Sequence, residues 1–418
     1  MKNPFIRINE NIVKYNLVNL SNLVFEVTDT CNLNCKYCGF GNFYYGYDKR
    51  EKNFLPFSKA KILIDYLVDL WNENLDKSLK QPLMIGFYGG EPLNNFKLIE
   101  EIVYYCNNLK IDCKKIQYNI TTNAVLLHRY IDFLVENKFY VLISLDGDEY
   151  NHSYRLFKNG KNSHSRVIGN IELIRSKYPD YFLNYINFNT VIHNRNSVEN
   201  AIYFILNNFG KIPSVSPLNN SGIKPEMVDD YRKTYQNVYL SVLNSANCNQ
   251  LENDMFIKAP RINSLAFYLH RFSGNVFDSY NAFFFNKKAL VIPTGTCLPF
   301  KKKMFVTVHG KILACEKITH NFSLGQIHND RIVLDLKKIA KIHNKYIFKF
   351  EKRCKTCLFK YDCPQCVYNV DDIIHENINC PRYKSEKNSQ DDIRTNLNYL
   401  SEHPEYYKKI MEEVKITQ

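Results

Sequence analysis

Cys31-Asn-Leu-Asn-Cys35-Lys-Tyr-Cys38 is the stretch of sequence that decides the fold and the chemistry of this chain. It follows an apolar run at residues 23–27 that is typical of a β-strand. Three thiolates can hold a four-iron cubane by three corners, which leaves the fourth iron without a protein ligand. A zinc ion is the alternative, but a structural zinc site normally takes four ligands, and no nearby His or fourth Cys stands at that spacing. The sequence therefore predicts an iron–sulfur cluster with one open iron.

Short apolar strands alternate with amphipathic helices between about residues 23 and 218, a pattern typical of a parallel α/β architecture. We expect strands at 23–28, 84–88, 116–121, 140–145, 186–192 and, with a weaker pattern, 212–215. The helices are expected at 58–74, 96–109, 127–136, 167–176 and 197–208. This alternation predicts a partial (β/α)6 barrel of the TIM type.

Short motifs stand where the predicted strands end. Gly89-Gly90-Glu91-Pro92 follows the second strand, Thr121-Thr122-Asn123 ends the third, and Ser144-Leu145-Asp146-Gly147 ends the fourth. In β/α barrels the reactive groups collect on the face where strands end and loops begin. We therefore expect these motifs to share one rim with the three cysteines.

The cysteine spacing, with an aromatic residue before the last cysteine, resembles the signature of the radical S-adenosylmethionine (radical SAM) enzymes. The resemblance implies that the amino and carboxylate groups of SAM chelate the open iron of a [4Fe-4S] cluster. Electron transfer would then cleave the sulfonium to a 5′-deoxyadenosyl radical. Gly89-Gly90-Glu91 resembles the family motif that holds the methionyl amine. The paired glycines let the backbone approach a ligand, Pro92 fixes the turn, and either backbone carbonyls or Glu91 would receive the ammonium group.

Other rim residues are predicted to bind the rest of SAM. Thr122, Asn123 and Ser144 offer neutral hydrogen-bonding groups suited to ribose hydroxyls and a carboxylate. Arg155 would pair with the carboxylate of SAM as a planar fork.

Three further rim residues have a structural alternative to SAM binding. Tyr37 would pack near the adenine or only anchor its loop. Asp146 would bind ribose or substrate, or only form a turn with Gly147. Ile192, at the end of the fifth strand, would contact the adenine or fill the core.

A second group of cysteines crowds the C-terminal region. It comprises Cys297, Cys315, Cys354, Cys357, Cys363, Cys366 and Cys380. By spacing alone, the pairs 354/357 and 363/366 would make a four-cysteine zinc site. Thirteen cysteines in a chain predicted to stay in a reducing compartment indicate metal or redox ligands rather than disulfides.

As a whole this region resembles the SPASM extension of radical SAM enzymes, which carries two auxiliary iron–sulfur clusters. The resemblance implies one [4Fe-4S] cluster enclosed by Cys354, Cys357, Cys363 and Cys380. It implies a second cluster held by Cys297, Cys315 and Cys366. The gap of two residues between Cys363 and Cys366 departs from the usual three, which leaves the partition of ligands open.

The cluster at Cys297 lacks an obvious fourth ligand, because no cysteine lies in the thirty residues before it. An open iron there would bind a substrate thiolate, unless water, a carboxylate or a backbone group fills the position. Glu316, next to Cys315, stands where sulfatase-maturing relatives have an acidic residue proposed to take a substrate proton. A solvated or cluster-bonding Glu316 is the alternative.

Changes in composition predict five segments. They are an N-terminal extension, a radical SAM core, a bridging segment, an auxiliary-cluster domain and a helical tail, at 1–20, 21–225, 226–292, 293–384 and 385–418. One helix is expected at 226–243, followed by no clean periodicity. Helices are hard to discern in the cysteine-rich part, where short strands are expected at 304–308 and 311–314. The tail is predicted to be helical at 393–400 and 404–414.

The formal net charge of +13 is scattered along the chain rather than concentrated in one basic tract. It predicts attraction to an acidic electron donor or an acidic peptide rather than to nucleic acid, with an ordinary solvated surface as the alternative. Residues 1–19 contain no continuous apolar segment, so we expect neither a signal peptide nor a membrane span. The sequence thus predicts a cytoplasmic protein.

We therefore predict an enzyme that modifies a ribosomally made peptide by hydrogen abstraction and thioether or carbon–carbon crosslinking. Residues 144–192 resemble bacterial peptide maturases most. The expected partners are the precursor peptide, a low-potential donor of the flavodoxin or ferredoxin type and, because residues 1–20 are too few for a leader-binding module, a separate leader-peptide-binding protein. The alternatives are an anaerobic sulfatase-maturing enzyme that makes formylglycine, and a non-catalytic iron–sulfur carrier or scaffold.

Overall fold

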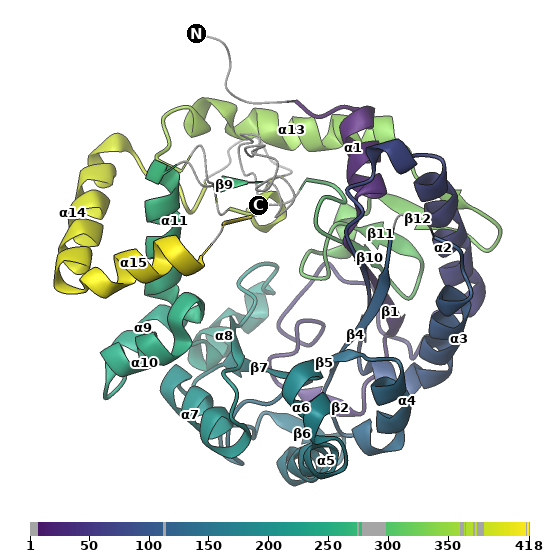
Figure 1. Cartoon of the computed structure of the whole chain (residues 1–418), viewed down its shortest axis with the longest axis horizontal. Coiled ribbons are helices and arrows are strands. Elements are labelled where there is room, and N and C mark those ends of the chain that lie inside the picture. Colours follow the sequence, from purple (N-terminus) through teal and green to yellow (C-terminus); the bar gives the residue numbers. More distant parts are fainter. Residues whose placement is uncertain are drawn as a thin grey trace. The chain divides into compact units, whose positions relative to one another are not determined.

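The computed structural model describes residues 7–111, 114–273, 276–277, 298–359, 363, 365–370, 373, 380–414 and 416–417 (Figure 1). The chain divides into two compact units. The barrel unit comprises Tyr15–Cys248 and Phe300–Asp335, and the C-terminal unit comprises Met1–Lys14, Asn249–Pro299 and Leu336–Gln418. No helix in the described part of the chain is both long and apolar enough to cross a membrane.

The barrel unit is built on one sheet with the order β13-β12-β11-β10-β1-β3-β4-β5-β7-β8. Six of its parallel strands match the six predicted strands. They are β1 (Asn22–Thr28), β3 (Leu83–Gly89), β4 (Ile116–Thr122), β5 (Tyr140–Ser144), β7 (Ile186–Ile192) and β8 (Ser214–Pro217). The predicted partial barrel is confirmed.

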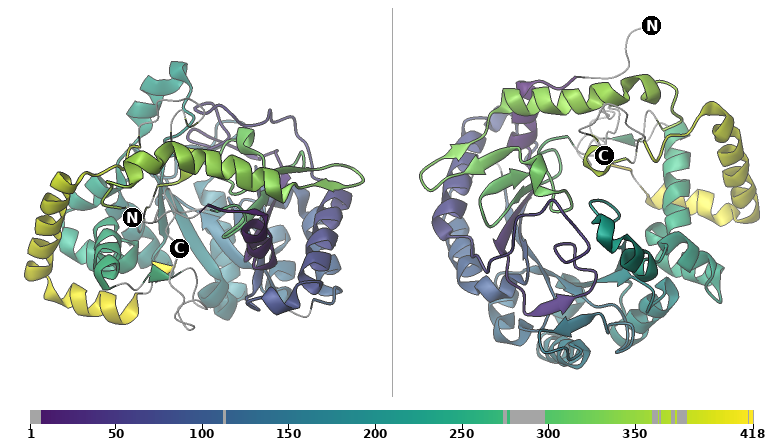
Figure 2. Two further views of the ribbon diagram at one scale, coloured as in Figure 1. Left: turned by 90° about the horizontal axis from the view of Figure 1, so that it is seen from above. Right: turned by 180° about the vertical axis from the view of Figure 1, so that it is seen from behind.

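The predicted helices of the barrel unit form with small shifts at their ends. They are α2 (Phe57–Asn72), α3 (Phe96–Asn107), α4 (Ile131–Glu136), α5 (His164–Lys177) and α7 (Val198–Phe209). On α2 the residues Ala60, Leu63 and Leu67 face inward and are fully buried, as their helical spacing requires. Figure 1 shows α2, α3, α4 and α7 around the outside of the strands, and the two views in Figure 2 show the same arrangement.

Residues 300–335 extend this sheet instead of folding apart from it. Strand β10 (Met304–Val306) pairs in parallel with β1, so that Val24 lies opposite Phe305. Strands β11 (Lys311–Leu313), β12 (Gly325–Ile327) and β13 (Ile332–Val333) follow as antiparallel neighbours. The two short strands expected from the sequence after residue 300 are thus strands of the barrel unit.

The helix predicted at 226–243 is broken into two, so that prediction was wrong in detail. Helix α8 (Val228–Thr234) ends where Tyr235 forms a bridge with His193, and α9 (Val238–Leu243) starts anew with the Asn237 side chain accepting from Leu240 N. A contact from a distant strand therefore interrupts the helix.

The sequence analysis also missed several helices. They are α1 (Glu10–Val18), α6 (Pro179–Tyr185), α10 (Cys248–Met255), α11 (Pro260–Ser273) and α13 (Leu336–Cys354). The expected tail helices are confirmed, as the longer α14 (Glu386–Glu402) and as α15 (Pro404–Glu413), which ends one residue earlier than predicted. Two short strands, β9 (Val276–Phe277) and β14 (Ile416–Thr417), pair in parallel within the C-terminal unit.

Candidate cluster and cofactor site

The three N-terminal cysteines lie in the loop that follows β1. The short strand β2 (Leu33–Cys35) pairs with β6 (Arg155–Phe157) and holds Cys35 opposite Arg155. Burial raises the pKa of Cys31 to about 11, and the charges of Cys31 and Cys38 act together on Cys35, whose pKa is also raised by burial. The three thiols are therefore close neighbours in a poorly solvated place, where thiolates need a metal to compensate their charge.

The number of these thiols fits a cluster better than a structural zinc ion, which normally takes four protein ligands. One zinc ion would draw all its sulfur ligands to about 2.3 Å from itself, whereas a cubane takes each thiolate at a separate iron. Cys31, Cys35 and Cys38 thus suit a four-iron cluster.

The loop from Gly89 to Pro92 is joined to the backbone just before Cys31. Gly90 N donates to Thr28 O and Glu91 N donates to Thr30 O, both at 2.9 Å. A Cβ on Gly90 would lie 2.1 Å from Thr30 O. Gly90 is therefore required because two protein loops come close together here. The sequence analysis gives another reason for a glycine at this place, the approach of a ligand.

Replacing Gly90 by Ala is expected to push the loop off Thr30 and destabilise the folded protein by about 2–3 kcal/mol, as overpacking does. The displaced backbone carries Cys31, so iron binding at the triad should weaken as well. Gly169→Ala is the matched control, because Gly169 lies exposed in α5 with nothing within 4 Å of an added Cβ; it is expected to stabilise by about 0.5–1 kcal/mol. Urea unfolding and iron content measure both variants, and equal stabilities would contradict the close approach.

Glu91 links the second rim motif to the third. Its carboxylate is buried and accepts hydrogen bonds from Thr122 Oγ1 at 2.7 Å, Asn123 N at 2.8 Å and Leu93 N at 3.2 Å. Asn123 Nδ2 in turn lies 3.8 Å from Cys31 Sγ. The second and third motifs therefore meet at the first cysteine, as the rim argument predicted. Pro92 stands at the first position of the short helix η2 (Pro92–Asn95).

Burial raises the pKa of Glu91 from 4.5 to about 7, although its hydrogen bonds act against this. Between these pH values the folded protein holds a proton that the unfolded chain has lost, so stability should fall by about 3 kcal/mol as pH rises from 4.5 to 7. We expect the free energy of unfolding of the wild type to fall relative to that of Glu91→Gln as the pH rises from 4.5 to 7. Both are measured on the metal-free reduced protein. Parallel curves would contradict a raised pKa.

A buried network around Asp146 supports the other side of the cysteine loop. Arg155 grips Asp146 with two hydrogen bonds, from Nε at 2.8 Å and from Nη2 at 3.0 Å, and Val191 N donates at 3.0 Å. Tyr37 Oη also donates to this carboxylate. Burial alone would raise the pKa of Asp146, but the charge of Arg155 holds it far below its usual range.

This network changes three of the predicted roles. The guanidinium of Arg155 forks onto Asp146, so the predicted pairing with the SAM carboxylate is replaced by an internal ion pair. Tyr37 anchors its loop through its hydroxyl group and is itself buried. Ile192 is fully buried, as its structural alternative of a core residue predicted. Ser144 is partly exposed at the end of β5, beside Asn189 of β7.

His193 belongs to the same network and was missed by the sequence analysis. Its ring is fully buried, stacks on Tyr37 with ring centroids 5.2 Å apart, and places Nε2 3.7 Å from Asp146 Oδ2. Its Nδ1 accepts from Arg195 N at 3.2 Å, which leaves Nε2 to carry a hydrogen toward Asp146. The signal was available, because His193 follows the fifth strand directly, at the rim.

Glu316 is held by a lysine. Lys303 Nζ donates to its two carboxylate oxygens at 2.9 and 2.8 Å, and Cys315 Sγ lies 3.3 Å from Oε2. Burial would raise the pKa of Glu316, but the charge of Lys303 prevails and lowers it. The carboxylate of Glu316 is thus kept ionised beside the thiol of Cys315. Because it is already paired with Lys303, it fits a residue that bonds to the cluster better than a free base.

Two tyrosines feel charges from both the first cysteine group and the Cys315–Glu316 pair. The charges of both Cys315 and Cys38 act on Tyr47, whose pKa is raised to about 12 mainly by burial. The charges of Glu316 and Cys38 act on Tyr88, which is raised mainly by burial too. Neither tyrosine was predicted, although Tyr88 directly precedes Gly89.

The C-terminal unit brings four of the remaining cysteines together. Burial raises the pKa of Cys354 to about 12, and the charges of Cys363, Cys357 and Cys380 contribute. These are the four residues predicted to enclose one cluster. Of the set predicted for the other cluster, Cys315 belongs to the barrel unit, Cys366 belongs to the C-terminal unit, and Cys297 lies outside the described residues.

Comparison with known proteins agrees with this site. Residues 25–202 match the Radical SAM superfamily. An uncharacterized protein of Methanocaldococcus jannaschii is 42% identical over 38% of this chain and 49% of its own length. A radical SAM cyclopropyl synthase of Paramaledivibacter caminithermalis is 32% identical over 40% of this chain and 34% of its own length. The chain therefore spans half or less of these two relatives.

Two further comparisons extend along nearly the whole chain. A cysteine-type anaerobic sulfatase-maturating enzyme of Clostridium perfringens is 25% identical over 87% of this chain and 94% of its own length. The solved structure of anSMEcpe with bound AdoMet and Cp18Cys peptide has a TM-score of 0.59 at 20% identity, covering 94% of this chain and 99% of that one. Residues 25–202, which contain the cysteine triad and its rim, are therefore a radical SAM domain, and the fold of the chain is similar to that of anSMEcpe.

Proposed function

We propose that this enzyme is a peptide maturase, which modifies a ribosomally made peptide by hydrogen abstraction and crosslinking. The observation that carries the proposal is the convergence of the cysteine triad, the Gly89–Pro92 loop and Asn123 on one rim of the barrel unit. The relatives add support, because one is a cyclopropyl synthase and another was solved with a peptide bound.

In this proposal Cys31, Cys35 and Cys38 would hold a [4Fe-4S] cluster with bound SAM, which would supply the radical chemistry. The chain supplies position and exclusion of water. The Glu91 oxygens are occupied by Thr122 and Asn123, so backbone carbonyls of the loop are the proposed acceptors for the ammonium group of SAM. Ser144 remains a proposed hydrogen-bonding partner of the ribose hydroxyls or the carboxylate of SAM.

Asp146, Arg155, Tyr37 and His193 are proposed as positioning residues. Arg155 pairs with Cys35 in the β2–β6 ladder and is bound to Asp146, so this network holds Cys35 in place. Their hydrogen bonds are made within the protein, so they are ordered before any ligand arrives.

Two auxiliary clusters are proposed for the other cysteines. Cys354, Cys357, Cys363 and Cys380 would enclose one, which the mutual influence of their thiols supports. Cys297, Cys315 and Cys366 would hold the other, with Glu316 and Lys303 beside it. We expect about twelve irons and about twelve sulfides per chain if all three sites hold cubanes; zinc with only about four irons would overturn this assignment.

Formylglycine formation is the second candidate, and the similarity of the whole chain to sulfatase-maturating enzymes favours it. The two reactions differ in what they remove from a cysteine peptide. A thioether or carbon–carbon crosslink removes two hydrogens and retains the sulfur, whereas formylglycine formation removes the sulfur. Mass spectrometry after incubation with SAM and dithionite, using a precursor peptide and a sulfatase-derived cysteine peptide in parallel, distinguishes them. Sulfur loss from the second peptide alone would overturn the maturase proposal.

A further inference from the structure

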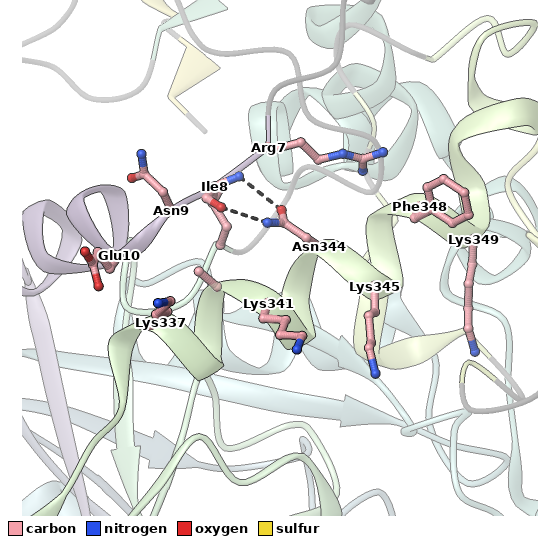
Figure 3. Close-up of a pocket in the computed structure, with 11 residues that line it drawn as sticks. Arg7, Ile8, Asn9, Glu10, Lys337, Lys341, Asn344, Lys345, Phe348 and Lys349 are labelled. Carbon is pink, nitrogen blue, oxygen red and sulfur yellow. Dashed lines mark hydrogen bonds between the residues drawn. The ribbon is translucent and has the colours of Figure 1, made fainter.

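Helix α13 (Leu336–Cys354) has more Lys and Arg residues than any other helix that the structure describes in the C-terminal unit. It carries seven Lys or Arg residues and one acidic residue, Glu351. Its apolar side is buried through residues such as Ile339, Ile347 and Phe350. Lysines recur every four residues, at positions 337, 341, 345 and 349, so they align along one side of the helix. Figure 3 shows Lys341, Lys345 and Lys349 as a row along α13.

Three lysines of this row have no acidic partner among the described residues. In the part of the chain that the structure describes, no carboxylate forms an ion pair with Lys337, Lys341 or Lys345, and all three are exposed. The acidic residue of the helix, Glu351, is already paired with Arg7 and Lys355. The positive charge of the row is therefore available to a partner.

An aromatic side chain lies beside the row. Phe348 is 70% exposed, and the guanidinium of Arg7 lies 5.6 Å from its ring centroid. Asn344 fixes the segment that carries Arg7, because its side chain accepts from Ile8 N at 3.0 Å and donates to Ile8 O at 2.7 Å (Figure 3). A fixed, exposed aromatic flanked by basic groups is typical of an interface anchor.

The helix leads directly to a proposed cluster ligand. Its last residue is Cys354, whose thiol neighbours Cys357, Cys363 and Cys380. Nine residues separate Lys345 from Cys354 along a continuous helix, a distance of roughly 14 Å at the usual rise per residue. A protein seated on the row would therefore sit close to that end of the helix.

We propose that α13 and Phe348 form the docking surface for a small acidic redox protein that donates single electrons. The inference rests on the proposed function, because it assigns the partner that would reduce the cluster proposed at Cys354. One electron leaves the reduced cofactor of the donor and enters that cluster, and no bond forms or breaks. An acidic segment of a precursor peptide is the competing occupant. The donor is favoured because the row runs along one rigid helix to a cluster ligand.

The test uses the full-length reconstituted enzyme and a flavodoxin as probe. The variant Lys337→Glu/Lys341→Glu/Lys345→Glu reverses the row. The matched control Lys110→Glu/Lys115→Glu/Lys233→Glu makes the same change in net charge at three exposed lysines of the barrel unit. Iron content and the unfolding midpoint verify that both variants are folded.

Flavodoxin binding is measured first, by equilibrium titration at low and high salt. Wild type and control should bind alike and lose affinity with salt, whereas the row variant should bind at least about tenfold more weakly with little dependence on salt. Phe348→Ser should weaken binding by about fivefold while leaving the salt dependence intact. Unchanged binding in the row variant would overturn the proposal.

SAM cleavage is measured second, with either flavodoxin or dithionite as reductant. At low flavodoxin the row variant should cleave SAM about tenfold more slowly, and with dithionite it should equal wild type. A rise in the KM of the row variant for peptide, measured with dithionite and with flavodoxin binding unchanged, would assign this surface to the peptide and overturn the proposal. Failure of wild type to cleave SAM with dithionite would defeat the proposed function, and the titration would still test the docking surface.

Discussion

Replacing Cys31, Cys35 and Cys38 together by Ala should abolish SAM cleavage and remove about four of about twelve irons. The three thiols are neighbours in a half-buried loop, and no other cysteine of the barrel unit belongs to that loop. Without them nothing retains the iron to which SAM would bind. Iron and sulfide analysis and chromatography of 5′-deoxyadenosine measure the two effects on anaerobically purified protein.

Cys106→Ala is the matched control for the triad. Cys106 is buried on α3, and burial alone raises the pKa of its thiol to about 12, with no other cysteine contributing. Its replacement should leave the iron content and SAM cleavage unchanged and cost about 1 kcal/mol of stability. Continued formation of 5′-deoxyadenosine by the triple variant would contradict the proposed cofactor site. So would an unchanged paramagnetic spectrum when SAM is added to reduced wild type.

Asp146→Ala should destabilise the folded protein by about 3–5 kcal/mol, because it leaves the charge of Arg155 buried without a partner. Both side chains are almost completely buried, and the carboxylate also accepts from Tyr37 and Val191. Iron binding should weaken too, because Arg155 lies opposite Cys35 in the β2–β6 pair. Urea unfolding of the metal-free reduced protein measures the first effect, and iron titration the second.

A double variant separates the ion pair from simple loss of packing. Asp146→Leu/Arg155→Met removes both charges, so it should be clearly more stable than Asp146→Ala. Asp132→Ala is the exposed control, since the pair of Asp132 with Lys177 lies in solvent and should contribute nothing measurable. Equal effects of Asp146→Ala and Asp132→Ala would contradict a role for the buried pair.

The strands and the rim could be predicted because both follow from the pattern of apolar and polar residues in short stretches of the sequence. A parallel strand buried on both faces is a short apolar run, and the chain must place loops at its end. That reasoning located the three cysteines, Glu91 and Asn123 together. It also contained the signal for His193, which ends a strand as Asp146 does.

The parts that could not be predicted depend on contacts between distant residues. Arg155 has the same sequence context whether it pairs with a ligand or with Asp146, and only the fold decides. The break after Thr234 arises from the bridge between Tyr235 and His193. Helix α13 is different, because Ile339, His343, Ile347 and Phe350 do recur with helical spacing. The many lysines between these residues hid their helical spacing, so the helix was not predicted from the sequence.

The pairing of β1 with β10 also governs how this protein is made. About 280 residues separate the two partners along the chain, so a ribosome working at about 5–20 residues per second leaves one edge of β1 without its partner β10 for roughly 15–60 s, although β3 covers the other edge. During that time an apolar strand presents unpaired amide and carbonyl groups. A gene truncated after β8 would leave this edge open permanently, and its product should aggregate.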